Sequence, residues 1–202
     1  MVLAAYCIGS LATSVWIGKS FYHIDVREFG SGNAGATNTF RVLGKRARIP
    51  VLILDILKGC VAVALAYFSK YEPGSSGFIN LEIGLGVAAL IGHIFPVFAG
   101  FRGGKGVATL LGVVVCIAPA ASALALIVFL IVLFSSRIVS LSSMLAGVSF
   151  PLFLIFLLGN SNPVLTVFSV VVSALLIVTH RKNIQRLLKN QESRVNLFAT
   201  RK

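Results

Sequence analysis

The sequence predicts an all-α integral membrane protein: a bundle of seven transmembrane helices, some of them short, that forms a single membrane-embedded domain over residues 1–202. Two global properties predict this class, because 57% of the residues are hydrophobic and the mean hydropathy is +0.94. Only 12% of the residues are charged, whereas a soluble globular domain carries about 25%. Long uncharged stretches supply the individual helices. These observations exclude an ordinary soluble domain.

Six stretches are apolar enough to cross a bilayer, which requires roughly 20 consecutive apolar residues. They cover residues 1–18, 50–68, 81–99, 107–134, 138–159 and 164–180. The first basic residue is Lys19, so the amino-terminal stretch lacks the basic leader of a cleaved signal peptide and is expected to be a retained first span.

The fourth stretch, from Val107 to Phe134, is either one long helix kinked at Pro119 or two short helices that turn near Ala118 to Ala121. Cytoplasmic loops of membrane proteins are enriched in Lys and Arg. Two crossings put the basic tail, which includes Arg201 and Lys202, on the same side as the basic first loop. Of the 18 Lys and Arg residues only Lys58 and Lys70 then fall elsewhere. We therefore predict seven helices, with the amino terminus outside and the carboxyl terminus cytoplasmic.

The first predicted cytoplasmic loop contains a run of small, hydroxyl and amide residues that ends at Arg41. The run satisfies the Gly-x-Gly-x-x-Gly pattern, but no strand precedes it and no βαβ unit fits between two membrane spans, so a dinucleotide site is excluded. Glycines allow close backbone approach, and hydroxyls, amides and cations can surround an oxyanion. The candidate ligands are Gly30, Ser31, Gly32, Asn33, Thr37, Asn38, Arg41 and Lys45. A flexible polar turn is the alternative.

The second predicted cytoplasmic loop interleaves glycines with two cations directly before an apolar stretch. Such a loop at a helix amino terminus is suited to bind phosphate, because free amides and the helix dipole favour an anion. It lacks the spacing of a Walker A loop, which disfavours nucleotide hydrolysis. The residues are Gly100, Arg102, Gly103, Gly104, Lys105, Gly106 and Thr109. The alternative is a glycine-hinged loop whose cations bind anionic lipid head groups.

A third polar group follows the last span. His180 and Asn183 are three apart on what we expect to be a continuing helix, so they share a face, and Arg186 extends it. Within spans, Asp55 and Lys58 are spaced to neutralise each other as a buried structural pair. His93 could orient the glycine-rich loop. Ser143, with Ser140 and Ser142, could add a hydroxyl to an inner site or merely pack helices.

Three motifs now coincide in order: GSGNAGATNTFR at 30–41, GHIFPVFAGFRGGKGVAT at 92–109 and THRKNIQRLL at 179–188. We call them the first, second and third motifs. Together they resemble the bacterial PlsY-type acyl-phosphate-dependent glycerol-3-phosphate acyltransferases, and the resemblance extends over nearly the whole chain. It implies a seven-helix enzyme of the bacterial inner membrane whose active site faces the cytoplasm. The implied reaction moves a fatty acyl group from acyl phosphate to the 1-hydroxyl of glycerol-3-phosphate, giving lysophosphatidic acid and phosphate, the first acylation step of phospholipid synthesis.

The resemblance implies catalytic roles for Ser31, Arg41, Lys105, His180 and Asn183, with the remaining loop residues named above and Ser143 as substrate ligands. Asp55, Lys58, His93 and Glu192 are expected to give structural support. One departure is Asn190, where the family usually has Gly. The implied partners are the two substrates, membrane lipids and, transiently, the soluble enzyme that makes acyl phosphate. No cofactor, metal or nucleic acid is expected.

The sequence leaves three questions open: the general base, the acyl donor and the function itself. The general base is either His180 or the phosphate of the substrate itself, whose second pKa is about 6. No histidine is followed by Asp at the His-x-x-x-x-Asp spacing of the other large acyltransferase class, which disfavours an acyl-CoA donor. The rival functions are a small anion transporter, although no internal repeat is visible, and a non-catalytic lipid-binding scaffold.

Overall fold

The computed structural model describes residues 1–195, so the predicted cytoplasmic placement of Arg201 and Lys202 lies outside the described residues. Within residues 1–195 every regular element is a helix and none is a strand, which confirms the all-α prediction. The chain divides into two compact units, Met1–Pro119 and the remainder from Ala120. Each unit is described by itself.

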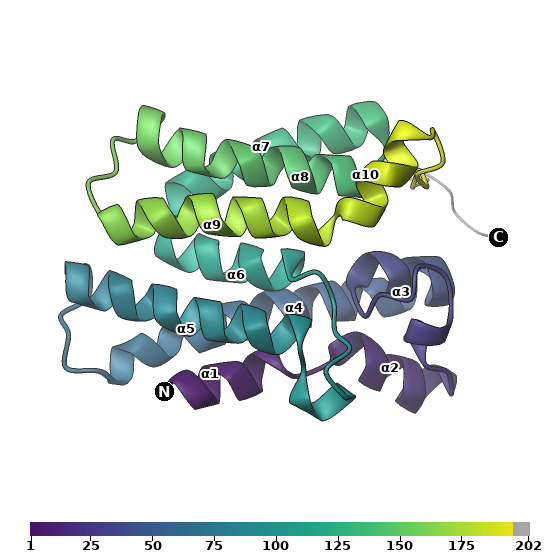
Figure 1. Cartoon of the computed structure of the whole chain (residues 1–202). Helices are drawn as coiled ribbons and strands as arrows, with labels where there is room; N and C mark the ends of the chain where they lie inside the picture. Colours follow the sequence, from purple (N-terminus) through teal and green to yellow (C-terminus); the bar gives the residue numbers. More distant parts are fainter. Residues whose placement is uncertain (196–202) are drawn as a thin grey trace. The chain divides into compact units, whose positions relative to one another are not determined.

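The first unit carries six α-helices and three short 3-10 turns (Figure 1). In chain order these are α1 Val2–Gly9, α2 Thr13–Tyr22, η1 Val26–Glu28, α3 Ala36–Leu43, α4 Lys45–Ala64, η2 Leu65–Phe68, α5 Ser76–Ile94, η3 Val97–Ala99 and α6 Val107–Ile117. The second unit comprises α7 Pro119–Ser136, α8 Val139–Leu152, the π-helical turn η4 Phe153–Leu157, α9 Pro163–Thr179 and α10 Arg181–Leu188.

Four continuous helical segments are long and apolar enough to cross a membrane: Lys45–Phe68, Ser76–Ala99, Pro119–Ser136 and Val139–Leu157. Two bent pairs, α1 with α2 and α9 with α10, raise the number to six when each pair counts as one span. Helix α6 is apolar but shorter. A chain of this kind is a multi-pass membrane protein, while the count of seven crossings and the direction of the termini stay predictions.

Several predicted boundaries are wrong. The first span is not one helix over residues 1–18, because α1 and α2 are separated by a break and bent by 40°. Helix α3 forms inside the stretch that was predicted to be loop. Helix α5 begins at Ser76 rather than at residue 81, because the Ser75 hydroxyl accepts a hydrogen bond from the Phe78 amide and caps the helix. The stretch 107–134 does divide into two helices, with the interruption at Ala118.

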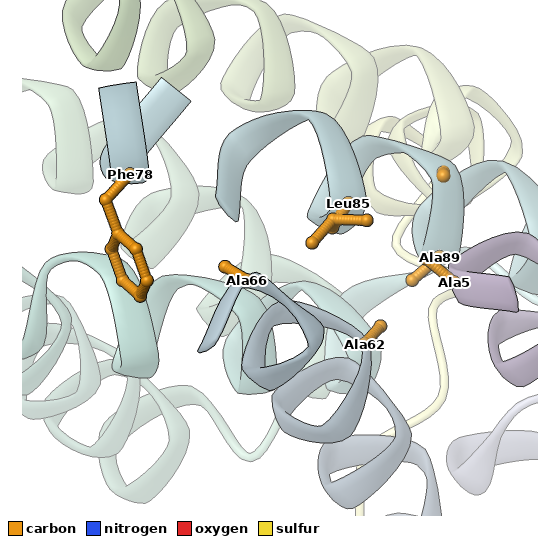
Figure 2. Packing of buried hydrophobic residues seen from close by; sticks show 7 residues of the cluster. Ala5, Ala62, Ala66, Phe78, Leu85 and Ala89 are labelled. Atoms are coloured by element: carbon orange, nitrogen blue, oxygen red, sulfur yellow. The ribbon is translucent and has the colours of Figure 1, made fainter. Parts of the chain in front are cut away.

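Small side chains let α1, α4 and α5 approach closely. Ala5, Ala62 and Ala89 are fully buried in one cluster with Phe78 and Leu85 (Figure 2). A Cβ added at Gly9 would overlap the backbone of Ala89 in α5. Lipid gives no hydrophobic driving force between helices, so such close backbone packing is how membrane helices gain contact energy.

The same device joins α4 to α6. A Cβ at Gly59 would overlap the Thr109 carbonyl oxygen, and a Cβ at Gly112 would overlap the Ile56 carbonyl oxygen. Each helix therefore has a glycine that lies against the backbone of the other, which allows the two helices to pack closely. The amino terminus of α6, where the second motif ends, is therefore fixed against the most buried part of α4.

Candidate functional site

The first motif is organised around the buried side chain of Asn38 on α3. Its amide nitrogen donates to the carbonyl oxygens of Val26 (2.8 Å) and Phe29 (3.1 Å). Its Oδ1 accepts from the Ser31 amide at 2.8 Å and from the Ser31 hydroxyl at 3.1 Å. Asn38 is only 2% exposed. Its amide therefore shapes the loop and aims Ser31, whose side chain lies at the surface.

Gly30 makes this arrangement possible. Its φ is +63°, and a Cβ there would crowd the Asn38 side-chain oxygen. Only glycine satisfies both the left-handed backbone and the close approach. Thr37 and Arg41 of the first motif lie at the surface of α3, and Lys45 lies at the surface where α4 begins. The hydroxyl and both cations are therefore exposed within one short stretch of the chain.

The second motif folds back on the end of α5. The Gly103 amide donates to the Ile94 carbonyl oxygen (3.2 Å) and the Gly104 amide donates to the His93 carbonyl oxygen (3.1 Å). These two amides are used within the protein, so they are not the donors of an anion site. The amides that a helix cannot use internally are those of the first turn of α6, which begins at Val107 directly after Gly106.

Arg27 in η1, three residues before the first motif, binds the second motif. Its Nη1 donates to the carbonyl oxygens of Ala99 (2.6 Å) and Arg102 (3.3 Å) in the second motif. Its Nε and Nη2 donate to the two carboxylate oxygens of Asp25 at 2.9 and 2.7 Å. These hydrogen bonds hold the pKa of the Asp25 carboxyl well below its usual range, although partial burial acts against them. The Ala34 amide adds a longer contact to the Gly103 carbonyl oxygen, 3.4 Å.

A buried polar cluster lies behind the second motif. Lys58 and Asp55 form an ion pair of 2.8 Å, with side-chain exposures of 5% and 2%. The Thr13 hydroxyl donates to Asp55 (2.8 Å), and Lys58 Nζ donates to the Leu11 carbonyl oxygen (2.9 Å) at the break between α1 and α2. In a membrane a broken helix survives only where its freed carbonyls find donors. Lys58 supplies one from α4.

His93 connects this cluster to the second motif. Its Nδ1 lies 3.1 Å from the Thr109 hydroxyl and 3.7 Å from an Asp55 carboxylate oxygen. A Cβ at Gly104 would overlap the His93 ring. Thr109 is fully buried and its hydroxyl contacts His93, while direct binding of substrate by Thr109 stays a prediction.

The third motif lies in the second unit, at a bend of 58° between α9 and α10. The expectation of a continuing helix through His180 is wrong, because His180 leaves helical geometry and ends α9. His180 Nδ1 lies 2.8 Å from the Leu176 carbonyl oxygen. A carbonyl only accepts, so Nδ1 carries the proton and, in the neutral ring, Nε2 is the basic nitrogen.

Glu192 secures the helix after the bend. Its carboxylate accepts from Asn183 Nδ2 (2.9 Å) and from Arg186 Nε (2.7 Å), and its side chain is 5% exposed. Burial raises the pKa of this carboxyl, but the hydrogen bonds from Arg186 and Asn183 outweigh burial and lower it. Asn190 has a φ of +54°. Asn tolerates this left-handed conformation better than other non-glycine residues, so the departure from Gly keeps the turn.

Ser143 does not present a free hydroxyl. Its Oγ donates to the Val139 carbonyl oxygen of its own helix at 2.9 Å, and the residue is 5% exposed. This bond lies within α8, and binding of substrate by Ser143 stays a prediction. Among residues 1–195, no group of three or more His, Cys, Asp or Glu side chains is arranged to hold a metal ion.

The chain is similar to known proteins over nearly its whole length. A family model described as glycerol-3-phosphate acyltransferase matches residues 1–190. The glycerol-3-phosphate acyltransferase of Enterococcus faecalis is 43% identical over 203 residues, covering 97% of this chain and 91% of that protein. The enzyme of the same name from Listeria welshimeri is 44% identical over 193 residues, covering 96% of this chain and 94% of that protein.

Two solved structures share the fold. One is PlsY (YgiH), an integral membrane glycerol 3-phosphate acyltransferase, in its glycerol 3-phosphate form, with a TM-score of 0.87 and 39% identity. The match covers 98% of this chain and 97% of that one. The lysophosphatidic acid form gives a TM-score of 0.82 at 38% identity, covering 96% of this chain and 93% of the other.

Proposed function

Since the chain belongs to the glycerol-3-phosphate acyltransferase family, we propose that it transfers a fatty acyl group from acyl phosphate to the 1-hydroxyl of glycerol-3-phosphate. The products are 1-acyl-glycerol-3-phosphate and inorganic phosphate. The acyl donor, the position acylated and the residue roles are the parts of this proposal that go beyond family membership.

The observation that carries the proposal is the junction of the first two motifs. Asn38 aims Ser31 to the surface, and Arg27 binds the loop that leads into α6. Both substrates carry a phosphate, and a helix amino terminus flanked by fixed cations is a ready phosphate site. We propose that the amides are those of the first turn of α6, that one cation is Lys105, directly before Gly106, and that Arg41 of α3 is the second cation.

In the proposed step the 1-hydroxyl oxygen of glycerol-3-phosphate attacks the acyl carbonyl carbon. The bond from that carbon to the phosphate oxygen breaks, and phosphate leaves with the electron pair. Acyl phosphate is a mixed anhydride whose leaving group departs readily, so no covalent enzyme intermediate is needed. Ser31 is therefore a ligand to phosphate or hydroxyl rather than a nucleophile, while Arg41 and Lys105 stabilise the developing charge.

In the second unit, His180 and Asn183 are proposed to bind and orient glycerol-3-phosphate. The hydrogen bond of His180 Nδ1 to Leu176 leaves Nε2 as the nitrogen able to accept the hydroxyl proton. The alternative acceptor of that proton is the substrate's own phosphate. Glu192 fixes the orientation of Asn183 through its 2.9 Å hydrogen bond.

We propose positioning or packing roles for Asn38, Thr109 and Ser143. The Asn38 amide bonds within the first motif, the Thr109 hydroxyl contacts His93, and the Ser143 hydroxyl bonds within α8. The remaining proposed ligands to the substrates are Gly30, Gly32, Asn33, Thr37, Lys45, Gly100, Arg102 and Gly106. Gly103 and Gly104 allow the loop to pack against α5.

We further propose that the chain crosses the bacterial inner membrane seven times, with the amino terminus outside and the site facing the cytoplasm. The placement of the basic residues supports this orientation. Acyl phosphate would then arrive from the soluble enzyme that makes it, by transient contact at the same face.

The test is a two-donor assay on the purified protein in detergent, with glycerol-3-phosphate and either palmitoyl phosphate or palmitoyl-CoA. Lysophosphatidic acid and phosphate should form with palmitoyl phosphate alone. Formation of lysophosphatidic acid with palmitoyl-CoA alone would refute acyl phosphate as the donor. If neither donor reacts while labelled glycerol-3-phosphate enters sealed vesicles containing the protein, the function is transport.

Residue roles are tested by single replacements in the same assay. Ser31→Ala, Lys105→Ala and His180→Ala should each lower turnover by at least about a hundredfold, with an unchanged gel-filtration profile. Lys70→Ala, which removes an exposed cation from the loop between η2 and α5, is the matched control. Wild-type rates in the three site variants would refute the assignment.

A further inference from the structure

The side chain of Arg27 is largely buried and hydrogen-bonded on both sides, which the sequence alone did not indicate. Its side chain is 14% exposed and its guanidinium has two separate sets of partners. One edge holds both carboxylate oxygens of Asp25, and the remaining nitrogen reaches two carbonyl oxygens of the second motif. Asp25 also forms an ion pair with Lys19, whose Nζ lies 3.3 Å from Asp25 Oδ2. Asp25 therefore fixes the guanidinium of Arg27, which in turn binds the loop through Ala99 and Arg102.

The two carbonyls bound by Arg27 flank a strained turn. Gly100 and Phe101 lie between Ala99 and Arg102, and their φ angles are +63° and +58°. A non-glycine residue in this left-handed region costs about 1–2 kcal/mol. Such a conformation persists only where the surroundings enforce it. The Phe101 amide donates to the Pro96 carbonyl oxygen at 2.9 Å, and Arg27 is a side chain that binds the backbone on both sides of the pair.

The strained turn comes directly before the proposed phosphate-binding part of the second motif. Two residues separate Arg102 from Lys105, and α6 starts directly afterwards at Val107. The first motif also contacts this loop through the Ala34 amide, 3.4 Å from the Gly103 carbonyl oxygen. Arg27 lies three residues before Gly30, so it ties the start of the first motif to the second.

We propose that Arg27 is a positioning residue for acyl transfer: it sets the spacing between Ser31 and the Lys105–α6 phosphate site by holding the turn at residues 99–102. The inference rests on the proposed function and deepens it. The guanidinium itself is committed to Asp25 and to backbone carbonyls, so it acts through the loop. Its loss should weaken capture of a phosphate-bearing substrate, because a displacement of about 1 Å in a binding group costs up to a hundredfold.

A purely structural role predicts a different result. Loss of folding stability would reduce the amount of active protein and the apparent kcat, but the molecules that remain folded would bind substrate with the original KM. The KM for each phosphate substrate, and the inhibition constant of inorganic phosphate, therefore separate positioning from general stability.

The experiment compares Arg27→Lys, Arg27→Ala and Asp25→Asn with wild type, using phosphate release from palmitoyl phosphate. Arg46→Ala is the matched control, because it removes an exposed cation at the start of α4. Arg27→Ala should raise the KM of at least one phosphate substrate about tenfold or more, with a parallel rise in the inhibition constant of phosphate. Arg27→Lys keeps the positive charge but cannot form hydrogen bonds on two sides of a planar guanidinium. Its KM should therefore lie between those of wild type and Arg27→Ala. Arg46→Ala should stay within about twofold of wild type.

A readout that does not depend on turnover accompanies the kinetics. Amide hydrogen exchange of the peptide covering residues 99–106 should be faster by about tenfold in Arg27→Lys, because the turn loses its external support. If the wild-type protein releases no phosphate, the proposed function fails, and the exchange measurement alone then tests the inference.

The inference is overturned if Arg27→Lys and Asp25→Asn keep both KM values within about twofold of wild type, or if only kcat falls. Unchanged exchange over residues 99–106 in Arg27→Lys also overturns it. Should Arg27→Ala fail to fold, the other two variants decide the question.

Discussion

The ion pair between Asp55 and Lys58 allows a quantitative prediction about stability. The two side chains are 2.8 Å apart, and each is at most 5% exposed within α4. Asp55→Asn removes the negative charge but keeps an oxygen that can accept the hydrogen bond of Thr13. The ammonium of Lys58 would then be buried in a membrane span without a counter-charge, with only the Leu11 carbonyl as a recorded acceptor.

Breaking one partner of a buried ion pair costs about 3–5 kcal/mol, whereas replacing both partners by uncharged groups is often close to neutral. Asn keeps one hydrogen bond, so we expect the lower end, about 3 kcal/mol. For a chain of this length each kcal/mol shifts Tm by about 2–4 °C. Asp55→Asn should therefore lower Tm by about 6–12 °C.

The double variant Asp55→Asn with Lys58→Met tests the physical reason. It removes the unpaired charge but leaves the Leu11 carbonyl without its donor, which costs about 1–3 kcal/mol. Its Tm should therefore lie above that of Asp55→Asn alone. The measurement is thermal unfolding of purified protein in one detergent at fixed pH. Glu72→Gln, at an exposed acid between η2 and α5, is the control and should leave Tm unchanged.

The reasoning is refuted if Asp55→Asn unfolds within about 1 °C of wild type. It is also refuted if the double variant is less stable than Asp55→Asn alone, since the penalty would then not come from an uncompensated charge.

Three further predictions concern the glycine-rich loop and the carboxyl-terminal turn. Gly103→Ala should raise the KM of a phosphate substrate by about tenfold or more, because its Cβ would overlap backbone carbonyls at the end of α5. Gly74→Ala, which has φ of +82° and nothing within 4 Å, should cost about 1 kcal/mol of stability with unchanged KM; equal kinetic effects would contradict the geometry. Asn190→Gly should leave Tm equal or higher, whereas Asn190→Val should lower it, and the reverse order would contradict the left-handed turn. Because the folded pKa of Glu192 is lowered, its contribution to stability is present above its ordinary value of 4.5 and is lost as pH falls through the folded pKa. Below that pH the wild-type Tm should converge on the Tm of Glu192→Gln, and a constant difference at every pH would show that the charge on Glu192 contributes nothing.

Hydropathy was sufficient to locate the long apolar helices of α4, α5, α7 and α8 approximately, because lipid demands long apolar stretches. The pairing of Asp55 with Lys58 was also predictable, since a spacing of three on a helix places both side chains on one face. Both predictions depend on residues close together in sequence. They needed no knowledge of which helices touch.

The break between α1 and α2 was not predictable in the same way. Gly9 ends α1, but a single Gly is common within membrane helices, and residues 10–12 are Ser, Leu and Ala. The break is stabilised by Lys58, which donates to the Leu11 carbonyl from a helix that follows much later in the chain. A local pattern contains no information on such a partner. The same holds for Arg27, whose short spacing from Asp25 was visible but whose carbonyl partners at Ala99 and Arg102 were not.

Asn38 illustrates a different limit. Its type and position made it a reasonable phosphate ligand, because an amide beside glycines can contact an anion. The structure instead buries it and uses both of its polar atoms to hold the loop. Composition identifies which residues are able to bind an anion, but only the fold decides which of them point outward and which hold the others in place.

The buried charges and the second motif belong to one chain of contacts in the first unit. Lys58 supports the break at Leu11, Asp55 lies 3.7 Å from His93, and the His93 carbonyl accepts from the Gly104 amide. Charges inside a membrane are costly and persist where they are paired and serve the protein. If the pair served stability alone, the double variant of Asp55 and Lys58 should keep the wild-type KM. We instead expect its KM to stay raised even where Tm recovers. The variant replaces the Asp55 carboxylate that lies next to His93, and His93 in turn contacts the second motif. A wild-type KM in the double variant would confine the pair to folding.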